Sequence, residues 1–418
     1  MLVRNELKLS NYNCVYSDEQ NVIIYNTRIG SLVQLSADEY EKLLSNEFDD
    51  EFLEKLYLLG IVVDKDFDEY EFVLNKLKLN IEKKRDPIFR ILPTTRCNAR
   101  CFYCYEHGMK QEDMTSETVA QTIEYIKNKT IDHKTININW FGGEPLLRFD
   151  IMEKISNRLI TYCEETNKSF CASLITNGSL FDNDKIARVD SLCLKTIQIT
   201  LDGTNLEYCK RKNYYDKNIN LETILSNIES ILKNSKARVH VRLNFDKNNF
   251  EDTKVLIKQL KERFYGFKKL GIYAYPLFAT HASKNPHIIS IENANEYFEE
   301  LISLLNGNKN TLFLLPRPKS TNCFVYNESS CVISSNGDIL KCTNAPNSVL
   351  GHLTENNISQ PLNYQWKTLC ISSSCRECKL FPVCLGGCKA KILNNEEYCC
   401  VHKNLMNIYL KNIIRGRK

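Results

Sequence analysis

The sequence predicts an α/β protein built around an open, partial barrel of six parallel strands, a (β/α)6 arrangement. Between residue 88 and about residue 315, short apolar runs alternate six times with longer amphipathic segments. Glycine-rich and polar motifs follow several of these runs, and a cysteine motif follows the first. Because functional residues of such barrels lie at the carboxyl ends of the strands, we expect the site at that end.

Each expected strand is rich in β-branched or aromatic residues and precedes a helical pattern. The first is FRILPTT, before a helix from Ser116, and the second is TININWFGG, before a helix from Phe149. The other four pairs are ASLITNG with a helix from Asp182, TIQITLDG with a helix from Leu221, VHVRLNF with a helix near Asp252, and GIYAYPL with a helix from Glu292.

Two further segments flank the expected barrel of residues 86–315. Residues 1–85 contain strands that turn at Gly30 (NVIIYNTRIGSLVQLS), helical DEYEKLLSNEFDDEFLEKLYLLG and a returning strand, IVVD, which together predict a winged-helix-like module. A linking helix, EFVLNKLKLNIEKKRD, leads out of it. Residues 316–418 are loop-rich and cysteine-dense, so we expect them to fold around metal.

Composition excludes several classes of function. The 55 basic and 51 acidic residues give a net charge of only +4, which does not indicate a nucleic-acid partner. No signal peptide and no apolar run of about 18 residues is present, so a cytoplasmic protein without a membrane partner is expected. In that compartment 18 cysteines indicate metal ligation or redox chemistry rather than disulfides. Five scattered ones are expected to be buried apolar residues: Cys14, Cys163, Cys171, Cys193 and Cys209.

Three cysteines, Cys97, Cys101 and Cys104, lie in the stretch RCNARCFYC directly after the first expected strand. Three thiolates on a short loop can hold three corners of a 4Fe-4S cluster and leave one iron open to another ligand. Structural zinc is the alternative, but it needs a fourth protein ligand, which is not nearby. Tyr103, before the last cysteine, can shield the cluster from solvent.

This spacing, CxxxCxΦC with an aromatic residue at Φ, resembles the motif of the radical S-adenosylmethionine (SAM) enzymes. The resemblance implies a partial TIM-like barrel in which SAM chelates the fourth iron. Reduction of the cluster then yields a 5'-deoxyadenosyl radical that abstracts a hydrogen atom. In such enzymes the cofactor supplies the chemistry, and the protein supplies orientation and exclusion of water.

Other strand ends carry the same resemblance. Gly142, Gly143 and Glu144 in WFGGEPLL by themselves fit a plain turn, but they resemble the family's GGEP motif, which implies contact with the methionine amino group. LITNGSLF and QITLDGTN resemble the TNG and SLDG segments. By this resemblance the residues that reach the ribose or methionine carboxylate, or add a charged hydrogen bond, are Asn177, Thr200, Asp202 and Arg211. Ordinary polar residues at strand ends would look the same.

The C-terminal cysteines form a second pattern, in which Cys375-x2-Cys378-x5-Cys384-x3-Cys388 follows Cys323-x13-Gly337-x4-Cys342. Zinc would need about two CxxC pairs, and only one is present. The pattern resembles the SPASM domain, which carries two auxiliary 4Fe-4S clusters and brings the expected total to three.

The same resemblance implies a ligand set for each auxiliary cluster. The outer cluster would be held by Cys375, Cys378, Cys384 and a late cysteine, Cys400 in preference to Cys399, and the inner one by Cys388, Cys323 and Cys342. Cys331 is either the fourth inner ligand or leaves an iron open for a substrate cysteine. Cys370 is expected to be structural or spare.

SPASM proteins mostly modify peptides, so a precursor peptide is the expected partner, with flavodoxin or ferredoxin as an external electron donor. Sulfatase maturases carry an aspartate base where this chain has Thr343, and they generally lack an N-terminal module. Peptide maturases commonly have a leader-recognition module that adds the leader to a sheet edge. The resemblance therefore favours a maturase that installs a crosslink, most often a Cys thioether.

Several alternatives to thioether formation stay open. They are formylglycine formation, carbon-carbon crosslinking or epimerisation of a peptide, a small-molecule radical enzyme, and a zinc-ribbon scaffold protein. The sequence identifies no catalytic acid or base.

Overall fold

The computed structural model describes residues 6–416 except 46, 48, 107, 278–286, 290–292, 306–314, 322, 346–347, 356–358, 395–398 and 401. Its centre is a nine-stranded sheet of order β11-β10-β9-β8-β7-β6-β12-β13-β14, and the six strands β6 to β11 are mutually parallel. Their bounds are β6 (Ile88–Ile91), β7 (Thr135–Trp140), β8 (Ser169–Thr176), β9 (Leu194–Leu201), β10 (Arg238–Phe245) and β11 (Leu270–Pro276). The predicted α/β class with a mainly parallel sheet is confirmed.

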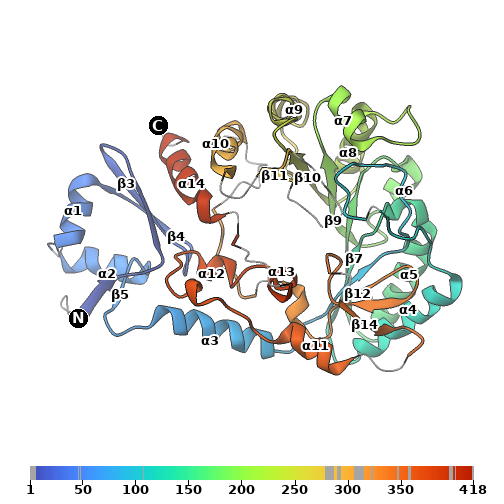
Figure 1. Ribbon diagram of the computed structural model, residues 1–418, viewed down its shortest axis with the longest axis horizontal. Helices are drawn as coiled ribbons and strands as arrows, with labels where there is room; N and C mark the ends of the chain where they lie inside the picture. Colours follow the sequence, from blue (N-terminus) through green and yellow to red (C-terminus); the bar gives the residue numbers. More distant parts are fainter. Residues whose placement is uncertain are drawn as a thin grey trace.

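Helices follow the strands and cover the outside of this curved sheet (Figure 1). They are α4 (Ser116–Lys129), the 3-10 turn η2 (Pro145–Arg148) with α5 (Phe149–Glu165), α6 (Asn183–Ala187), α7 (Asn205–Lys212), α8 (Leu221–Asn234), α9 (Phe250–Arg263) and α10 (Ala294–Leu305). Two begin at clear caps: Thr115 accepts from the Thr118 amide, and Asn220 forms a capping box with Thr223. The expected start of the last helix, Glu292, lies outside the described residues, and α7 was not predicted.

Strand residues alternate between an apolar outer face and a polar inner face. On β7, Ile136, Ile138 and Trp140 are fully or almost fully buried in the core that includes the helices, whereas Asn137 and Asn139 remain partly exposed. The same alternation continues on β8, β9 and β10. The barrel therefore has an apolar shell and a polar interior that solvent still reaches.

The C-terminal segment extends the barrel sheet, which sequence analysis did not predict. Strand β12 (Cys331–Ile333) pairs parallel with β6, and β13 (Asp338–Leu340) and β14 (Val349–His352) follow antiparallel. The rest consists of η3 (Phe324–Tyr326), α11 (Gln360–Lys367), η5 (Ser373–Cys375), α12 (Phe381–Cys384), α13 (Lys389–Leu393) and α14 (His402–Gly416). This segment is thus attached to the barrel by backbone pairing as well as by its cysteines.

The N-terminal segment has the predicted hairpin, β3 (Asn21–Asn26) and β4 (Ser31–Ser36), which turns at Gly30 with a φ of +84°. Strand β2 (Asn13–Ser17), which was not predicted, completes a three-stranded antiparallel sheet in which β4 is an edge strand. A second sheet pairs β1 (Leu7–Leu9) with β5 (Val62–Asp64). The helices are α1 (Ala37–Ser45), α2 (Asp50–Leu58) and α3 (Glu69–Glu82).

Two packing contacts help to fix this N-terminal segment to the rest of the chain. Helix α14 packs against β2, β3 and α10, so it joins the N-terminal sheet to the barrel (Figure 1). Helix α3 shares an apolar core with the C-terminal segment, in which Val73 and Leu77 lie with Tyr326 and Phe381. Over the described part of the chain, no helix has the length and apolarity that crossing a membrane requires.

Candidate functional site

The three cysteines after β6 lie together on one loop. Burial, and then the charges of Glu144, Cys101 and Cys104, raise the pKa of Cys97 to about 12, so the three sulfurs are near enough to interact. Among the described residues, no group of three His, Cys, Asp or Glu side chains is spaced to hold a single metal ion. A 4Fe-4S cluster is larger than one ion and takes thiolate ligands, so these three thiols fit a cluster better than zinc.

Gly142 and Gly143 support the base of this loop. The Gly143 amide donates to the Thr94 carbonyl at 3.2 Å, and the Glu144 amide donates to the Arg96 carbonyl at 2.8 Å. A Cβ on Gly143 would lie 2.2 Å from the Arg96 oxygen, and Gly142 has a φ of +115°. Glycine is therefore required here because the segment after β7 approaches the backbone of the segment that leads into the cysteine loop.

Glu144 links the ends of β7 and β8. Its buried carboxylate accepts from the Thr176 hydroxyl at 2.7 Å, the Asn177 amide at 2.8 Å and the Leu146 amide at 3.1 Å. Burial raises the pKa of Glu144. The Asn177 side chain in turn donates to Asn98 of the cysteine loop at 2.8 Å. Both predicted residues therefore lie at the loop.

Tyr103 and Thr200, which are partly buried, form a network with the buried side chains of Asp202 and Lys212. The Tyr103 hydroxyl lies 2.7 and 2.8 Å from the two Asp202 carboxylate oxygens, and the Lys212 ammonium lies 2.9 Å from Asp202 and 2.8 Å from the Thr200 hydroxyl. Burial opposes the charge on Lys212, but Asp202 and Tyr103 raise its pKa well above the ordinary value. The network therefore places a fixed ammonium beside Cys101 at the end of β9.

Arg211 lies beside the cysteine loop, where its guanidinium is 4.9 Å from the centre of the Phe102 ring and interacts with Asp202 and Tyr103. It also forms a second buried ion pair, 2.8 Å from Asp246, and the next residue, Lys212, reaches the end of β9. Sequence reasoning missed Lys212 because α7 was not recognised. A helical reading would have placed Tyr208 and Lys212, four residues apart, on one buried face.

The C-terminal cysteines fall into two groups. The sulfurs within each group are close enough to interact electrostatically. Burial is the larger cause of the raised pKa of Cys342 and of Cys375, and the neighbouring sulfurs of the same group raise it further. One group is Cys323, Cys342 and Cys388, and the other is Cys375, Cys378, Cys384, Cys399 and Cys400. A hydrogen bond from Cys400 lowers the pKa of Cys384 to about 6. The structure thus brings together every predicted auxiliary ligand except Cys331.

Cys331 lies apart from both groups. It is buried on β12, and its sulfur is 4.0 Å from the Tyr125 hydroxyl. Among the described residues, the groups that shift the pKa of Cys331 are Tyr125, Lys341 and Lys129, and none of them is a cysteine. Cys331 lies apart because β12 pairs with β6, and this pairing places the Cys331 side chain in the apolar core of the barrel.

Cys370, by contrast, lies beside the first group. Cys370, Cys323 and Cys388 all interact with the buried Tyr326. Burial is the larger cause of the raised pKa of Tyr326, and the three sulfurs raise it further. The Lys389 ammonium, also buried, donates to the Cys370 sulfur at 3.2 Å. Sequence spacing gave no indication of this proximity.

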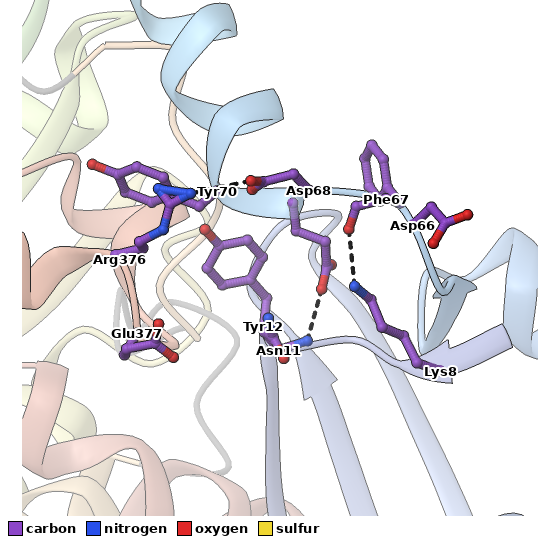
Figure 2. Close-up of a pocket in the computed structure, with 10 residues that line it drawn as sticks. Lys8, Asn11, Tyr12, Asp66, Phe67, Asp68, Tyr70, Arg376 and Glu377 are labelled. Carbon is purple, nitrogen blue, oxygen red and sulfur yellow. Dashed lines mark hydrogen bonds and ion pairs between the residues drawn. The ribbon is translucent and has the colours of Figure 1, made fainter.

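A pocket of about 250 Å³ lies between the N-terminal and C-terminal segments (Figure 2). Arg376, which separates Cys375 from Cys378 in the sequence, lies 3.2 Å from Asp68 across it. Glu69 is buried and accepts from the Asn11 amide at 2.7 Å. The N-terminal segment therefore contacts the chain directly beside the second cysteine group.

Residues 91–262 match the model of the Radical SAM superfamily. An uncharacterized protein of Methanocaldococcus jannaschii is 27% identical over 268 residues, which is 63% of this chain and 87% of that protein. The cysteine-type anaerobic sulfatase-maturating enzyme of Clostridium perfringens is 22% identical over 70% of this chain and 86% of its own length. This chain spans about half the length of the probable GTP 3',8-cyclases of Methanococcus maripaludis that it also matches, 55% for one that is 30% identical.

Two solved structures share the fold. Native anSMEcpe with bound AdoMet has a TM-score of 0.62 at 16% identity and covers 79% of this chain and 99% of its own. Streptococcus suis SuiB bound to its precursor peptide SuiA has a TM-score of 0.54 at 16% identity and covers 93% of this chain and 97% of its own.

Proposed function

We propose, from the premise that this chain is an enzyme with a radical SAM domain over residues 91–262, that it modifies a ribosomally made precursor peptide. The expected product is a crosslink, most often a thioether between a cysteine sulfur and a carbon atom. The observation that carries the proposal is the combination of a barrel with an N-terminal module and a cysteine-rich C-terminal segment that pack against one another in one chain.

The residues around the first cysteine loop fit a 4Fe-4S cluster and SAM. Cys97, Cys101 and Cys104 would hold three irons, and the Lys212 ammonium, paired with Asp202, would hold the end of β9 in place beside Cys101. Bound SAM supplies a 5'-deoxyadenosyl radical when the cluster is reduced. The chain's own part is to orient the cofactor at the strand ends, where Asn177 and Thr200 offer polar atoms, and to exclude water.

Two auxiliary clusters are proposed for the two C-terminal cysteine groups. Cys375, Cys378, Cys384 and Cys400 supply four thiols for the outer one. The inner group supplies three, with Cys370 rather than Cys331 near enough to be considered as a fourth. Crosslink formation that starts with hydrogen abstraction leaves one electron to be removed from the product, and a cluster held by these thiols would supply an acceptor for it.

The N-terminal module is proposed to bind the leader of the precursor. In the described chain β4 pairs only with β3, so its outer edge is open to an added strand. The coverage of the two structures supports this role. The match to anSMEcpe leaves about a fifth of this chain uncovered, close to the share of residues 1–85, whereas SuiB, which was solved with its precursor peptide, covers 93%.

Formylglycine formation is the second candidate, because the relative from Clostridium perfringens is a sulfatase-maturating enzyme. The site residue that disfavours it is Thr343, which follows Cys342 where those enzymes carry an aspartate. The Thr343 hydroxyl accepts from Arg90 at 3.2 Å and has no acidic function of its own.

The test of the function is anaerobic incubation of reconstituted protein with SAM, dithionite and a cysteine-containing precursor peptide encoded beside its gene. Mass spectrometry should show 5'-deoxyadenosine and a peptide that is two hydrogens lighter per site and resistant to thiol alkylation. An aldehyde at the cysteine would indicate formylglycine formation instead. Formation of 5'-deoxyadenosine with an unchanged peptide would contradict the substrate proposed here.

The leader-binding role has its own test, since deleting residues 1–85 would uncover the core that α3 shares with the C-terminal segment. Val33→Pro and Gln34→Pro are a matched pair on β4, because adjacent amides of a strand point to opposite sides. The proline at the position whose amide points away from β3 should weaken leader binding without changing the melting temperature. The proline at the position whose amide points toward β3 interrupts that pairing and should lower the melting temperature. Full leader binding by both variants would refute the assignment to β4.

A further inference from the structure

The inward-facing positions of the barrel strands carry positive charge and no acidic side chain. These positions are the ones that alternate with the buried outer residues on β6 to β11. Their partly or fully buried polar side chains are Arg90, Thr135, Asn137, Asn139, Cys171, Ser173, Thr196, Gln198, Thr200, His240, Arg242, Asn244, Tyr273 and Tyr275. This set contains two arginines and a histidine, and neither aspartate nor glutamate.

Arg242, on β10, is the member whose charge is least balanced. Its Nε donates to the Asn244 side chain at 2.9 Å, and its guanidinium lies 4.7 Å from the centre of the Tyr275 ring. It also interacts with Tyr273, a neighbour on β11. None of these partners is an anion, and the described residues contain no carboxylate in an ion pair with Arg242.

The two neighbouring cations from α7 already have counter-charges, because Lys212 is paired with Asp202 and Arg211 is paired with Asp246. Arg90, on β6, has no carboxylate partner among the described residues, but it lies beside Cys323 and Cys342. Arg242 is thus an arginine inside the barrel, away from the C-terminal cysteines, for which the described residues supply no anionic partner.

The position of Arg242 is next to the reacting end of the barrel. Asn244, its hydrogen-bond partner, donates to the Tyr103 hydroxyl at 3.4 Å, and Thr200 is paired with Arg242 in the β9–β10 register. A molecule that reaches the cofactor network from the interior of the barrel therefore passes the guanidinium. A partly enclosed cationic surface concentrates anions, and a guanidinium binds carboxylates through two parallel hydrogen bonds.

We propose that Arg242 binds a carboxylate side chain of the substrate peptide, so that the modified segment carries an aspartate or glutamate close to the reacting residue. This inference rests on the proposed peptide function and narrows its substrate class. Tyr273 and Gln198, joined by a 2.8 Å hydrogen bond, form the adjacent polar wall.

Two fluorescein-labelled peptides with amidated C-termini test the proposal: Gly-Ser-Cys-Gly-Asp-Ser-Gly and its counterpart with asparagine in place of aspartate. Binding is followed by fluorescence anisotropy under anaerobic conditions with the reconstituted full-length enzyme and SAM. The wild type should bind the aspartate peptide at least tenfold more tightly than the asparagine peptide. This preference should fall to less than twofold in Arg242→Gln.

Arg238→Gln is the matched control, because Arg238 lies on the same strand and face but is exposed. It should keep the tenfold preference, and Arg242→Gln should bind SAM within twofold of wild type. Equal binding of both peptides by the wild type would overturn the proposal and leave the peptide function intact. Failure of both peptides to bind would overturn the proposal, whereas the peptide function is tested separately with the leader-bearing precursor. A large loss of SAM affinity in Arg242→Gln would show that the anion bound by Arg242 belongs to the cofactor, which would also overturn the proposal.

Discussion

Lys212 and Asp202 form an ion pair of 2.9 Å in which the two side chains are 2% and 0% exposed. The aspartate comes from the end of β9, and the lysine comes from the last turn of α7. Because Tyr103 also bonds Asp202, this pair connects the cysteine loop to the barrel.

Replacing Lys212 with methionine should destabilise the protein and weaken SAM binding together. Removing one partner of a buried pair leaves an unpaired buried charge and costs about 3–5 kcal/mol. Urea denaturation should show that loss, and equilibrium dialysis should show at least a tenfold weaker affinity for SAM. The control is Lys210→Met on the same helix, whose side chain is 77% exposed, and it should change neither quantity. Wild-type affinity in Lys212→Met would show that the network around Lys212 does not position the cofactor.

Gly143→Ala should remove the first cluster selectively. The new Cβ would lie 2.2 Å from the Arg96 oxygen, which is backbone and leads directly into Cys97, so the loop must shift. If the three proposed clusters are present, iron after reconstitution should fall from about 12 to about 8 per chain. The comparison is Gly266→Ala, where a Cβ meets nothing within 4 Å and the cost is confined to a positive φ. Unchanged iron in Gly143→Ala would mean that the loop tolerates the shift.

Local periodicity explains which parts of the fold the sequence predicted. The barrel strands alternate and the barrel helices repeat every 3.6 residues, so both are visible in short windows. Pairing of β12 with β6 joins residues more than 240 positions apart, and no local pattern encodes it. Strands β1 and β2 were missed for a similar reason, because their short segments acquire strand geometry through their partners β5 and β3.

The site shows the same division. Cys97, Cys101 and Cys104 share one loop, so their spacing sufficed to predict that they lie together. Arg211 and Lys212 are adjacent, and only the orientation of α7 decides which of them faces the end of β9. That orientation depends on tertiary packing, which outweighs the preference for arginine in a charged hydrogen bond.

Stability should decrease as the pH falls below about 6.5, the ordinary pKa of histidine, in part because of His240. Burial in the barrel, and then the nearby charge of Arg238, lower the pKa of His240. In this range the unfolded chain binds a proton that the folded chain resists, so unfolding becomes more favourable. His240→Gln should reduce the difference in urea midpoint between pH 7 and pH 5.5. An identical pH dependence in wild type and variant would assign the effect to other groups.

Cys331 and Cys370 give the sharpest comparison for the auxiliary clusters. Cys331 contacts Tyr125 in the barrel core, so Cys331→Ala should lower stability but leave iron at about 12 per chain. Cys370 lies with the inner cysteines around Tyr326 and bonds to Lys389, so Cys370→Ala should change the electron paramagnetic resonance signal of one auxiliary cluster or reduce the iron content. Cys209→Ala, at a cysteine outside both groups, should leave the spectrum unchanged. Iron loss in Cys331→Ala together with a wild-type spectrum in Cys370→Ala would support the ligand set expected from the sequence, in which Cys331 is a ligand. That ligand set would require β12 to rearrange when the cluster is bound.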